Sequence, residues 1–87
     1  MPAKQLELRI IMPGREESLF ADMVVVRATT GDLGVLPGRA PVTAALDTGE
    51  MRVYEGEAVR RITVFGGVMR VENNVMMVIT EHVLEKP

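Results

Sequence analysis

Apolar and polar residues alternate along most of this chain. The clearest case is residues 5–11, where Leu6, Leu8 and Ile10 are separated by polar residues. A period of two places such a set on one face of a strand, whereas a helix would need a period near 3.6. Residues 59–65 show the same alternation. Both segments are therefore predicted to be half-buried β-strands.

The remaining apolar runs are short and are separated by residues typical of turns. Residues 19–27 and 75–80 are apolar on both faces, and the shorter runs are 42–46, 51–54 and 68–72. Turn signals occur about every 8–12 residues, and helical spacing is weak, which is typical of a sandwich or barrel. We predict one all-β domain over residues 1–87, a flattened β-sandwich or barrel of about 8–10 short strands. Residues 81–87 are predicted to be a polar tail that frays. The turn signals are Pro13-Gly14, Asp47–Gly49, Glu55-Gly56 and Asn73-Asn74.

The stretch from Gly31 to Pro41, GDLGVLPGRAP, is the least ordinary part of the chain. It contains three glycines and two prolines around a very short apolar segment. Glycine permits tight turns and close approaches, and proline fixes φ and removes a donor. The composition indicates either a stiff binding loop or a tight corner. A second glycine pair, Gly66-Gly67, interrupts an otherwise continuous strand and indicates a bulge or a close backbone approach.

Composition and charge exclude several classes of function. The chain has 87 residues, a net charge of −2, no cysteine and only three aromatic residues. Its basic residues are scattered, so the electrostatic stripe and stacking platform of a nucleic-acid binder are lacking. No apolar run approaches the roughly 20 residues that span a bilayer, and residues 1–9 do not resemble a signal peptide. We predict a soluble intracellular domain without direct membrane insertion.

The residue inventory also argues against an active site. The single histidine, His82, lies in the tail, and Ser18 lacks the Gly-x-Ser-x-Gly turn of hydrolases. The adjacent acids at 16–17 are more often a solvated patch than an acid–base pair. Lys4 and Lys86 lie near the termini, which is incompatible with a lipoyl or biotinyl carrier domain. We therefore expect no catalytic residue, no metal site and no cofactor.

The apolar segments 24–26 and 75–79 leave two interpretations open. Both faces could be buried inside the sandwich, or one outer face could be covered by a partner. The chain has seven methionines, and methionine is common on docking surfaces. The pair Met76-Met77 therefore slightly favours a docking surface.

Taken together, these segments resemble the N-terminal β-sandwich domain of the epsilon subunit of F-type ATP synthases. The family pattern Gly-acidic-x-Gly-hydrophobic-x-Pro-Gly-His-Ala-Pro is matched by residues 31–41, and the Thr/Ala/Leu run that follows is matched by residues 42–46. A second match covers residues 66–71 and the Asn-x-Val-x-Val pattern after them, and Leu19-Phe20 is a weaker third. The resemblance extends over nearly the whole chain.

Three features depart from the family pattern. Arg39 stands where the family usually has histidine, and the spacing from Phe20 to Gly31 is a few residues shorter than usual. The chain stops at Pro87, whereas typical members continue into two helices that inhibit ATP hydrolysis and in some cases bind ATP. We expect either a naturally short member or a shortened form of a longer protein.

The resemblance implies a non-catalytic subunit of the rotor, or central stalk. Such a subunit links the gamma subunit to the c-ring and couples proton or other ion transport to ATP synthesis or hydrolysis, without binding nucleotide. The implied location is the cytoplasmic face of a bacterial inner membrane, as a peripheral part of the complex. The alternative is a β-sandwich adaptor that binds another protein outside any ATP synthase.

The resemblance also implies roles for individual residues. Asp32 is expected at the tip of a loop, where it either meets an arginine of the ring or only stabilises its turn. The expected c-ring-facing loop comprises Thr30, Gly31, Asp32 and Leu33. The expected gamma-facing residues are Arg39, Val42, Thr43, Ala44 and Phe65. The expected structural turn residues are Gly34, Pro37, Gly38, Pro41, Gly66 and Gly67.

Overall fold

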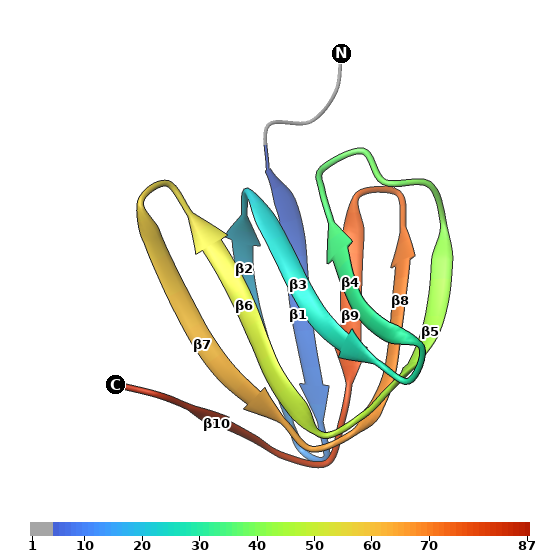
Figure 1. Ribbon diagram of the computed structural model, residues 1–87, viewed down its shortest axis with the longest axis vertical. Coiled ribbons are helices and arrows are strands. Elements are labelled where there is room, and N and C mark those ends of the chain that lie inside the picture. The colour runs from blue at the N-terminus through green and yellow to red at the C-terminus, as the bar shows by residue number, and fades with distance from the viewer. Residues whose placement is uncertain (1–4) are drawn as a thin grey trace.

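The computed structural model describes residues 5–87, which form ten β-strands and no helix (Figure 1). The predicted all-β class and the number of strands are confirmed. The strands are β1 (Leu6–Met12), β2 (Arg15–Ala21), β3 (Met23–Ala28), β4 (Gly31–Val35), β5 (Val42–Leu46), β6 (Gly49–Glu55), β7 (Ala58–Val64), β8 (Gly67–Glu72), β9 (Val75–Ile79) and β10 (Val83–Glu85).

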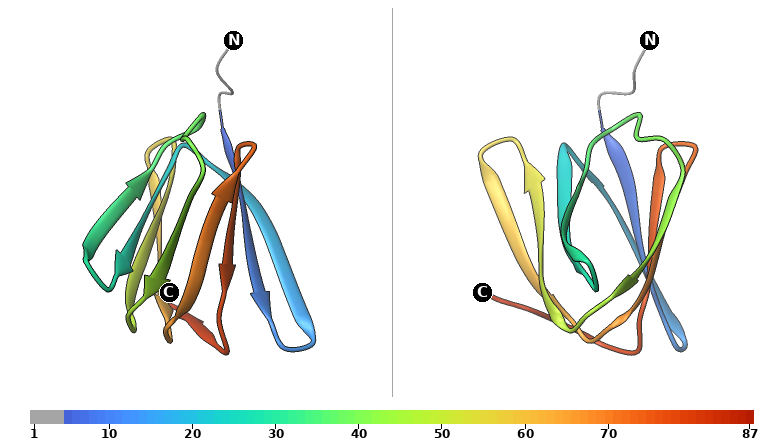
Figure 2. Two further views of the ribbon diagram at one scale, coloured as in Figure 1. Left: turned by 90° about the vertical axis from the view of Figure 1, so that its right-hand side faces the viewer. Right: turned by 45° about the vertical axis from the view of Figure 1, so that its right-hand side comes forward.

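The strands form one strongly curled sheet whose two halves face each other (Figure 2). The order across the sheet is β10-β7-β6-β3-β5-β8-β9-β1-β2, and β4 pairs with β3 outside this path. All neighbouring strands are antiparallel except β1 and β9, which are parallel. Because consecutive strands run in opposite directions, the turns gather at two ends of the molecule, the top and the bottom of Figure 1.

We call these the upper end and the lower end. The upper end carries the β2–β3, β4–β5, β6–β7 and β8–β9 connections, and the lower end carries the other five connections. The register of β5 and β8 agrees with this division. Val42 lies opposite Val71 near the upper end, and Leu46 lies opposite Gly67 near the lower end.

The core lies between the two halves of the curled sheet and consists of inward-facing residues of nearly every strand. Leu6, Leu8 and Ile10 are buried as the alternation predicted. Three methionines, Met51, Met69 and Met76, are also buried in this core. The expectation that the pair Met76-Met77 marks a docking surface is therefore wrong for Met76, because the pleat of β9 turns this side chain inward, whereas Met77 faces outward and is half-buried.

The turns agree with the sequence in some places and differ in others. Asn73 and Asn74 have φ of 51° and 63°, which confirms the predicted two-residue hairpin turn between β8 and β9. The segment predicted as one strand over residues 19–27 is divided between β2 and β3 by a corner at Asp22. At this corner the Asp22 amide donates to the Tyr54 carbonyl at 2.7 Å. The very short apolar segment after Gly31 lies in β4 as far as Val35.

The prediction of a frayed tail over residues 81–87 is wrong for most of its length. Strand β10 pairs antiparallel with β7, so that Leu84 lies opposite Thr63. The Arg60 guanidinium donates two hydrogen bonds of 2.6 Å to the Glu85 carboxylate. Before the strand, the His82 ring stacks on Phe65 with ring centroids 5.3 Å apart. These contacts come from residues distant in sequence, which a local polarity pattern does not show.

Candidate functional site: two ends and one apolar side

The motif GDLGVLPGRAP is not a single loop in the structure. Its first half forms β4, which pairs with β3, and residues 36–41 form the β4–β5 connection at the upper end, here called the Arg39 loop. The c-ring-facing loop predicted from the sequence is therefore mostly strand. Only Thr30 lies in the β3–β4 turn, whereas Gly31, Asp32 and Leu33 belong to β4.

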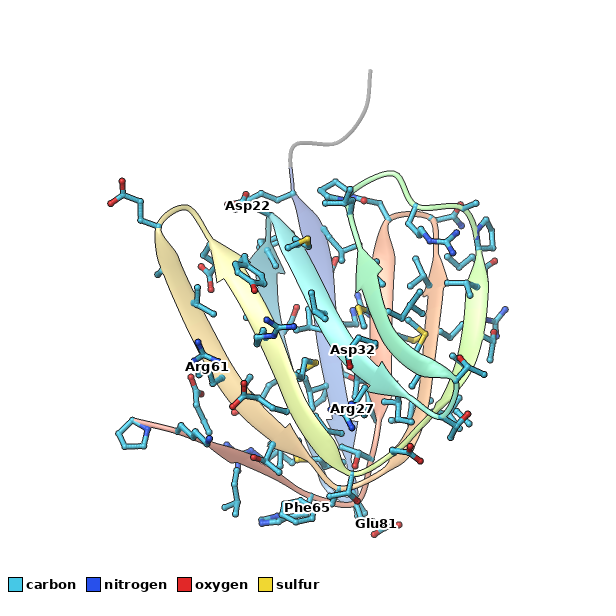
Figure 3. The ribbon with its side chains drawn as sticks, in the orientation of Figure 1. Asp22, Arg27, Asp32, Arg61, Phe65 and Glu81 are labelled. Carbon is cyan, nitrogen blue, oxygen red and sulfur yellow. The ribbon has the colours of Figure 1, made fainter. Side chains whose placement is uncertain are left out.

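Asp32 does not lie at a loop tip, so that part of the prediction is wrong. It lies opposite Arg27 in the β3–β4 pair, and the Arg27 Nε donates to its Oδ1 at 3.0 Å (Figure 3). Both side chains remain more than half exposed. Leu33 instead packs against the core. Asp32 thus forms an ion pair with Arg27 of the same sheet, near the lower end.

The predicted turn residues fall into two groups. Pro37 and Gly38 form a tight turn in which the Arg39 amide donates to the Leu36 carbonyl at 3.1 Å, and Gly38 has a φ of 81°. Pro41 follows directly before β5. Gly34 lies within β4 opposite Val25 and has no positive φ, so its assignment to a turn is wrong.

The second glycine pair confirms the predicted close backbone approach. Gly66 and Gly67 have φ of 71° and 115°, values that side chains rarely tolerate. A Cβ atom added at Gly67 would overlap the carbonyl oxygen of Ile79. Glycine is therefore required where β8 begins beside the end of β9.

The five residues expected to face gamma do not form one cluster. Arg39 lies in the β4–β5 connection at the upper end. Phe65 lies at the lower end (Figure 3). Val42 and Ala44 pack against the core, whereas Thr43, between them on β5, is exposed. Of these five residues, only Thr43 lies on the outer face of β5, on the side of the sandwich formed by β5, β8, β9 and β1.

This side carries an exposed apolar surface, of which the sequence pointed only to the segment 75–79 as a face that a partner could cover. Val68 lies opposite Ala45 on one neighbouring strand and opposite Ile79 on the other, and Ile79 lies beside Ile11 on β1. Val68 is 42% exposed and Ile79 48%. We call Ala45, Val68, Ile79 and Ile11 the apolar row. The signal in the sequence was the presence of valine and isoleucine at outward positions, but only the strand register brings them together.

A shallow cavity of about 350 Å³ continues the apolar row toward the lower end. Phe65, which is 40% exposed, forms part of its wall, and Glu81 lies beside it (Figure 3). The hydroxyl of Thr80 donates to the Phe65 carbonyl at 3.4 Å. The full lining is Ile11, Met12, Pro13, Phe65, Gly67, Ile79, Thr80 and Glu81.

The charges near this side differ between its middle and the lower end. Above the apolar row, Arg9 and Arg70 each pair at 2.7 Å with a glutamate two residues away on the same strand. The hydrogen bond from Arg9 holds the pKa of Glu7 below its usual value. At the lower end, Glu16, Asp47 and Glu81 have no ion pair within residues 5–87. The middle is thus locally neutralised and the lower end is acidic.

Within residues 5–87 no group of three or more His, Asp or Glu side chains is arranged to hold a metal ion. The same part of the chain contains no helix long and apolar enough to span a membrane. The described residues present three surface features: an exposed apolar side, an acidic lower end and the Arg39 loop at the upper end.

Comparison with known proteins identifies the family. The family described as ATP synthase, Delta/Epsilon chain, beta-sandwich domain matches residues 5–86. The ATP synthase epsilon chain of Synechococcus elongatus is 44% identical over 75 residues, which are 85% of this chain and 55% of that protein. The epsilon chain of Leptospira borgpetersenii is 34% identical over 85 residues, 94% of this chain and 65% of that protein. The chain thus spans little more than half to about two thirds of the length of these relatives.

Solved structures agree on the fold. One chain in the cryo-EM structure of the Euglena gracilis mitochondrial ATP synthase, OSCP/F1/c-ring, superposes with a TM-score of 0.90 at 21% sequence identity. The superposition covers 98% of the present chain and 56% of the Euglena chain. A chain from the Tetrahymena thermophila mitochondrial ATP synthase, central stalk/c-ring, has a TM-score of 0.78 at 11% identity and is matched over 97% and 69%. From its motifs, its ten-stranded curled sheet and its match over residues 5–86, the chain belongs to the delta/epsilon chain family of ATP synthase β-sandwich domains.

Proposed function

We propose that this domain is a non-catalytic part of the central stalk of an F-type ATP synthase. In this role it binds the gamma subunit and the c-ring and helps to couple ion transport to ATP synthesis or hydrolysis. The observation that carries the proposal is the family match over residues 5–86, together with relatives that are ATP synthase epsilon chains. The complex would hold the domain at the cytoplasmic face of a bacterial inner membrane as a peripheral component.

The gamma contact in this proposal is the outer face of β5, β8, β9 and β1. Arg39 lies near its upper end, Thr43 on its outward surface and Phe65 at its lower edge. Between them the apolar row supplies the contiguous apolar area that marks protein-binding surfaces. Val42 and Ala44 support this face from beneath, because their side chains pack against the core.

The c-ring contact in this proposal is the lower end, through the β3–β4 turn at Thr30 and the neighbouring acids. Asp32 uses Oδ1 to accept from Arg27 and remains 57% exposed, so its carboxylate can still accept a hydrogen bond from a cation of the ring. A charge-assisted bond of this kind contributes about 1.5–3 kcal/mol when shielded. It contributes only about 0–1 kcal/mol when it is fully exposed.

The domain should bind no nucleotide and should support coupling without inhibiting hydrolysis. The test is to add the chain to an ATP synthase complex depleted of its own epsilon chain, and then to measure copurification with gamma and the c-ring and ATP-driven proton pumping. We expect stoichiometric association and restored pumping, with hydrolysis largely retained. Absence of association with both partners would contradict the central-stalk assignment, and strong inhibition would contradict the non-inhibitory role.

Two valines provide a matched test of the gamma-facing side. Val68 on β8 is 42% exposed in the apolar row, and Val59 on β7 is 41% exposed in the other half of the sheet. Val68→Asp should weaken association with gamma at least about tenfold, since a charge would be buried in an apolar contact. Val59→Asp should leave association unchanged. Equal affinity of both variants would show that gamma binds elsewhere.

A further inference from the structure

The side chain of Asn74 connects three segments of the upper end that are far apart in sequence. Its Oδ1 accepts a hydrogen bond from the Gly38 amide at 2.9 Å, and its Nδ2 donates to the Gln5 carbonyl at 2.7 Å. The carbonyl of Asn74 also accepts from the Glu7 amide at 3.1 Å. One residue of the β8–β9 turn therefore contacts both the Arg39 loop and the beginning of β1, which lie side by side in both views (Figures 1 and 2).

The Arg39 loop has few other hydrogen bonds. Within residues 5–87 and outside the strand ladders, the bond to Asn74 is the only one that joins this loop to another segment. The bond between the Arg39 amide and the Leu36 carbonyl is internal to the loop, and the Arg39 guanidinium donates to its neighbour, the Ala40 carbonyl. Leu36 itself is 57% exposed and cannot anchor the loop by burial. Between the ends of the loop, which β4 and β5 hold in the sheet, the Asn74 side chain is thus the one hydrogen-bonding tie to the β8–β9 turn among the described residues.

The turn conformation alone does not require asparagine at position 74. Asn73 and Asn74 both have positive φ, a conformation that glycine adopts most easily and asparagine tolerates. Glycine would form the same turn without any side-chain bond. Asn73 has the same backbone conformation, but its side chain makes no hydrogen bond within residues 5–87. The turn therefore needs positive φ at both positions, whereas the loop needs an amide only at position 74.

We propose that Asn74 is a positioning residue that holds the Arg39 loop, and with it Arg39, in the orientation that binds the partner protein. The inference rests on the proposed function, in which Arg39 faces gamma. A loop already held in its bound conformation loses less conformational entropy on association than a free loop does. Asn74 would therefore increase affinity without contacting the partner itself.

The first experiment measures the loop in the isolated chain. Amide exchange of Gly38 with water is followed by NMR in the natural chain and in Asn74→Gly, Asn73→Gly and Asn74→Asp. Asn74→Gly should speed Gly38 exchange several-fold, up to about tenfold, because the Gly38 amide loses its hydrogen-bond acceptor. Asn73→Gly should not change it. Asn74→Asp keeps the acceptor for the Gly38 amide but loses the donor to the Gln5 carbonyl, so its exchange should lie between those of the natural chain and Asn74→Gly. Unchanged Gly38 exchange in Asn74→Gly would overturn the proposal.

The second experiment measures association of the same variants with an ATP synthase complex depleted of its epsilon chain. Asn74→Gly should bind more weakly by a factor similar to its increase in the Gly38 exchange rate. Asn73→Gly should bind like the natural chain, and Asn74→Asp should bind with an intermediate affinity. Normal association of Asn74→Gly, despite faster Gly38 exchange, would overturn the role of the loop in binding. If the natural chain also failed to associate, the proposed function would fail and the binding role of Asn74 with it. Gly38 exchange would still decide whether Asn74 holds the loop.

Discussion

The upper and lower ends of the sandwich are closed by different kinds of contact. At the upper end, polar side chains join the turns: Asn74 binds the Arg39 loop, and Asp22 accepts from the Gly56 amide at 2.6 Å. At the lower end, backbone groups do most of this work, as in the bonds from the Phe65 amide to the His82 carbonyl and from the Thr80 amide to the Ile11 carbonyl. At that end the backbones of Gly67 and Ile79 approach so closely that no side chain fits at position 67.

This difference has a consequence for function. A turn held by one side chain can be altered by one substitution while the strands keep their pairing. An end held by close backbone contacts tolerates fewer substitutions. Gly67, which makes such a contact, also lines the exposed apolar cavity beside Phe65. The upper end is thus easier to change by a single substitution than the lower end is.

The largest effect is expected at Gly67. Gly67→Ala would place a Cβ against the Ile79 carbonyl at a φ of 115°, so β8 and β9 must separate or the backbone must change conformation. We expect a loss of about 3 kcal/mol in the free energy of unfolding, measured by urea denaturation. Gly34→Ala is the control, because its site on β4 is open and has no positive φ. It should change stability by less than about 0.5 kcal/mol. Similar losses in both variants would contradict the close-approach interpretation.

Asp22 tests the upper end. Asp22→Ala removes the acceptor of the Gly56 amide, and we expect it to lower the free energy of unfolding by about 1 kcal/mol. The control is Asp47→Ala at the lower end, because the Asp47 side chain is exposed and makes no hydrogen bond within residues 5–87. Its effect should be below about 0.5 kcal/mol. Equal effects in thermal or urea unfolding would show that side-chain bonds do not distinguish the two ends.

A smaller and pH-dependent effect is expected at β10. The hydrogen bonds from Arg60 hold the pKa of Glu85 below its usual value of 4.5. Because the folded state lowers this pKa, the stabilisation is present at pH values above 4.5 and is lost as the pH falls through the lower folded value. Both side chains are about 40% exposed, so Glu85→Gln should cost at most about 1 kcal/mol at pH 7.

The measurement is the difference in unfolding free energy between Glu85→Gln and the natural chain from pH 7 to pH 3. Glu7 and Glu50 also have lowered pKa values through hydrogen bonds from Arg9 and Arg61. They are present in both proteins, so their contributions cancel. The difference should shrink toward zero in acid. A difference that stayed constant with pH would show that Glu85 acts through packing and not through its charge.

The smallest effect on stability is expected at Asp32, although its effect on coupling should be measurable. The pair with Arg27 is exposed, so Asp32→Asn should cost less than about 0.5 kcal/mol. If the lower end faces a basic ring loop, Asp32→Arg should weaken ring association more than Asp32→Asn, and more strongly at low salt, where screening is least. Normal proton pumping with both variants at low salt would show that Asp32 does not contact the ring and that its role is confined to the ion pair with Arg27.

Much of the fold could be predicted from the sequence because the determining features are local. The alternation at Leu6, Leu8 and Ile10 specifies which side of β1 is buried, and consecutive asparagines accommodate the positive φ of a tight hairpin turn. The motif from Gly31 to Pro41 also identified the family correctly. It did so although half of the motif is a strand and Asp32 does not occupy a loop tip.

Other features were decided only by the tertiary structure, because they depend on residues far apart in the chain. Strand β10 has only three residues and exists through its pairing with β7. The apolar row is created by the registers of β5, β8, β9 and β1, since no single strand contains more than one of its members. In the same way, local sequence shows that Asn74 can form a turn. Only the curl of the sheet brings the side-chain Oδ1 of Asn74 to 2.9 Å from the backbone nitrogen of Gly38, 36 residues away in the sequence.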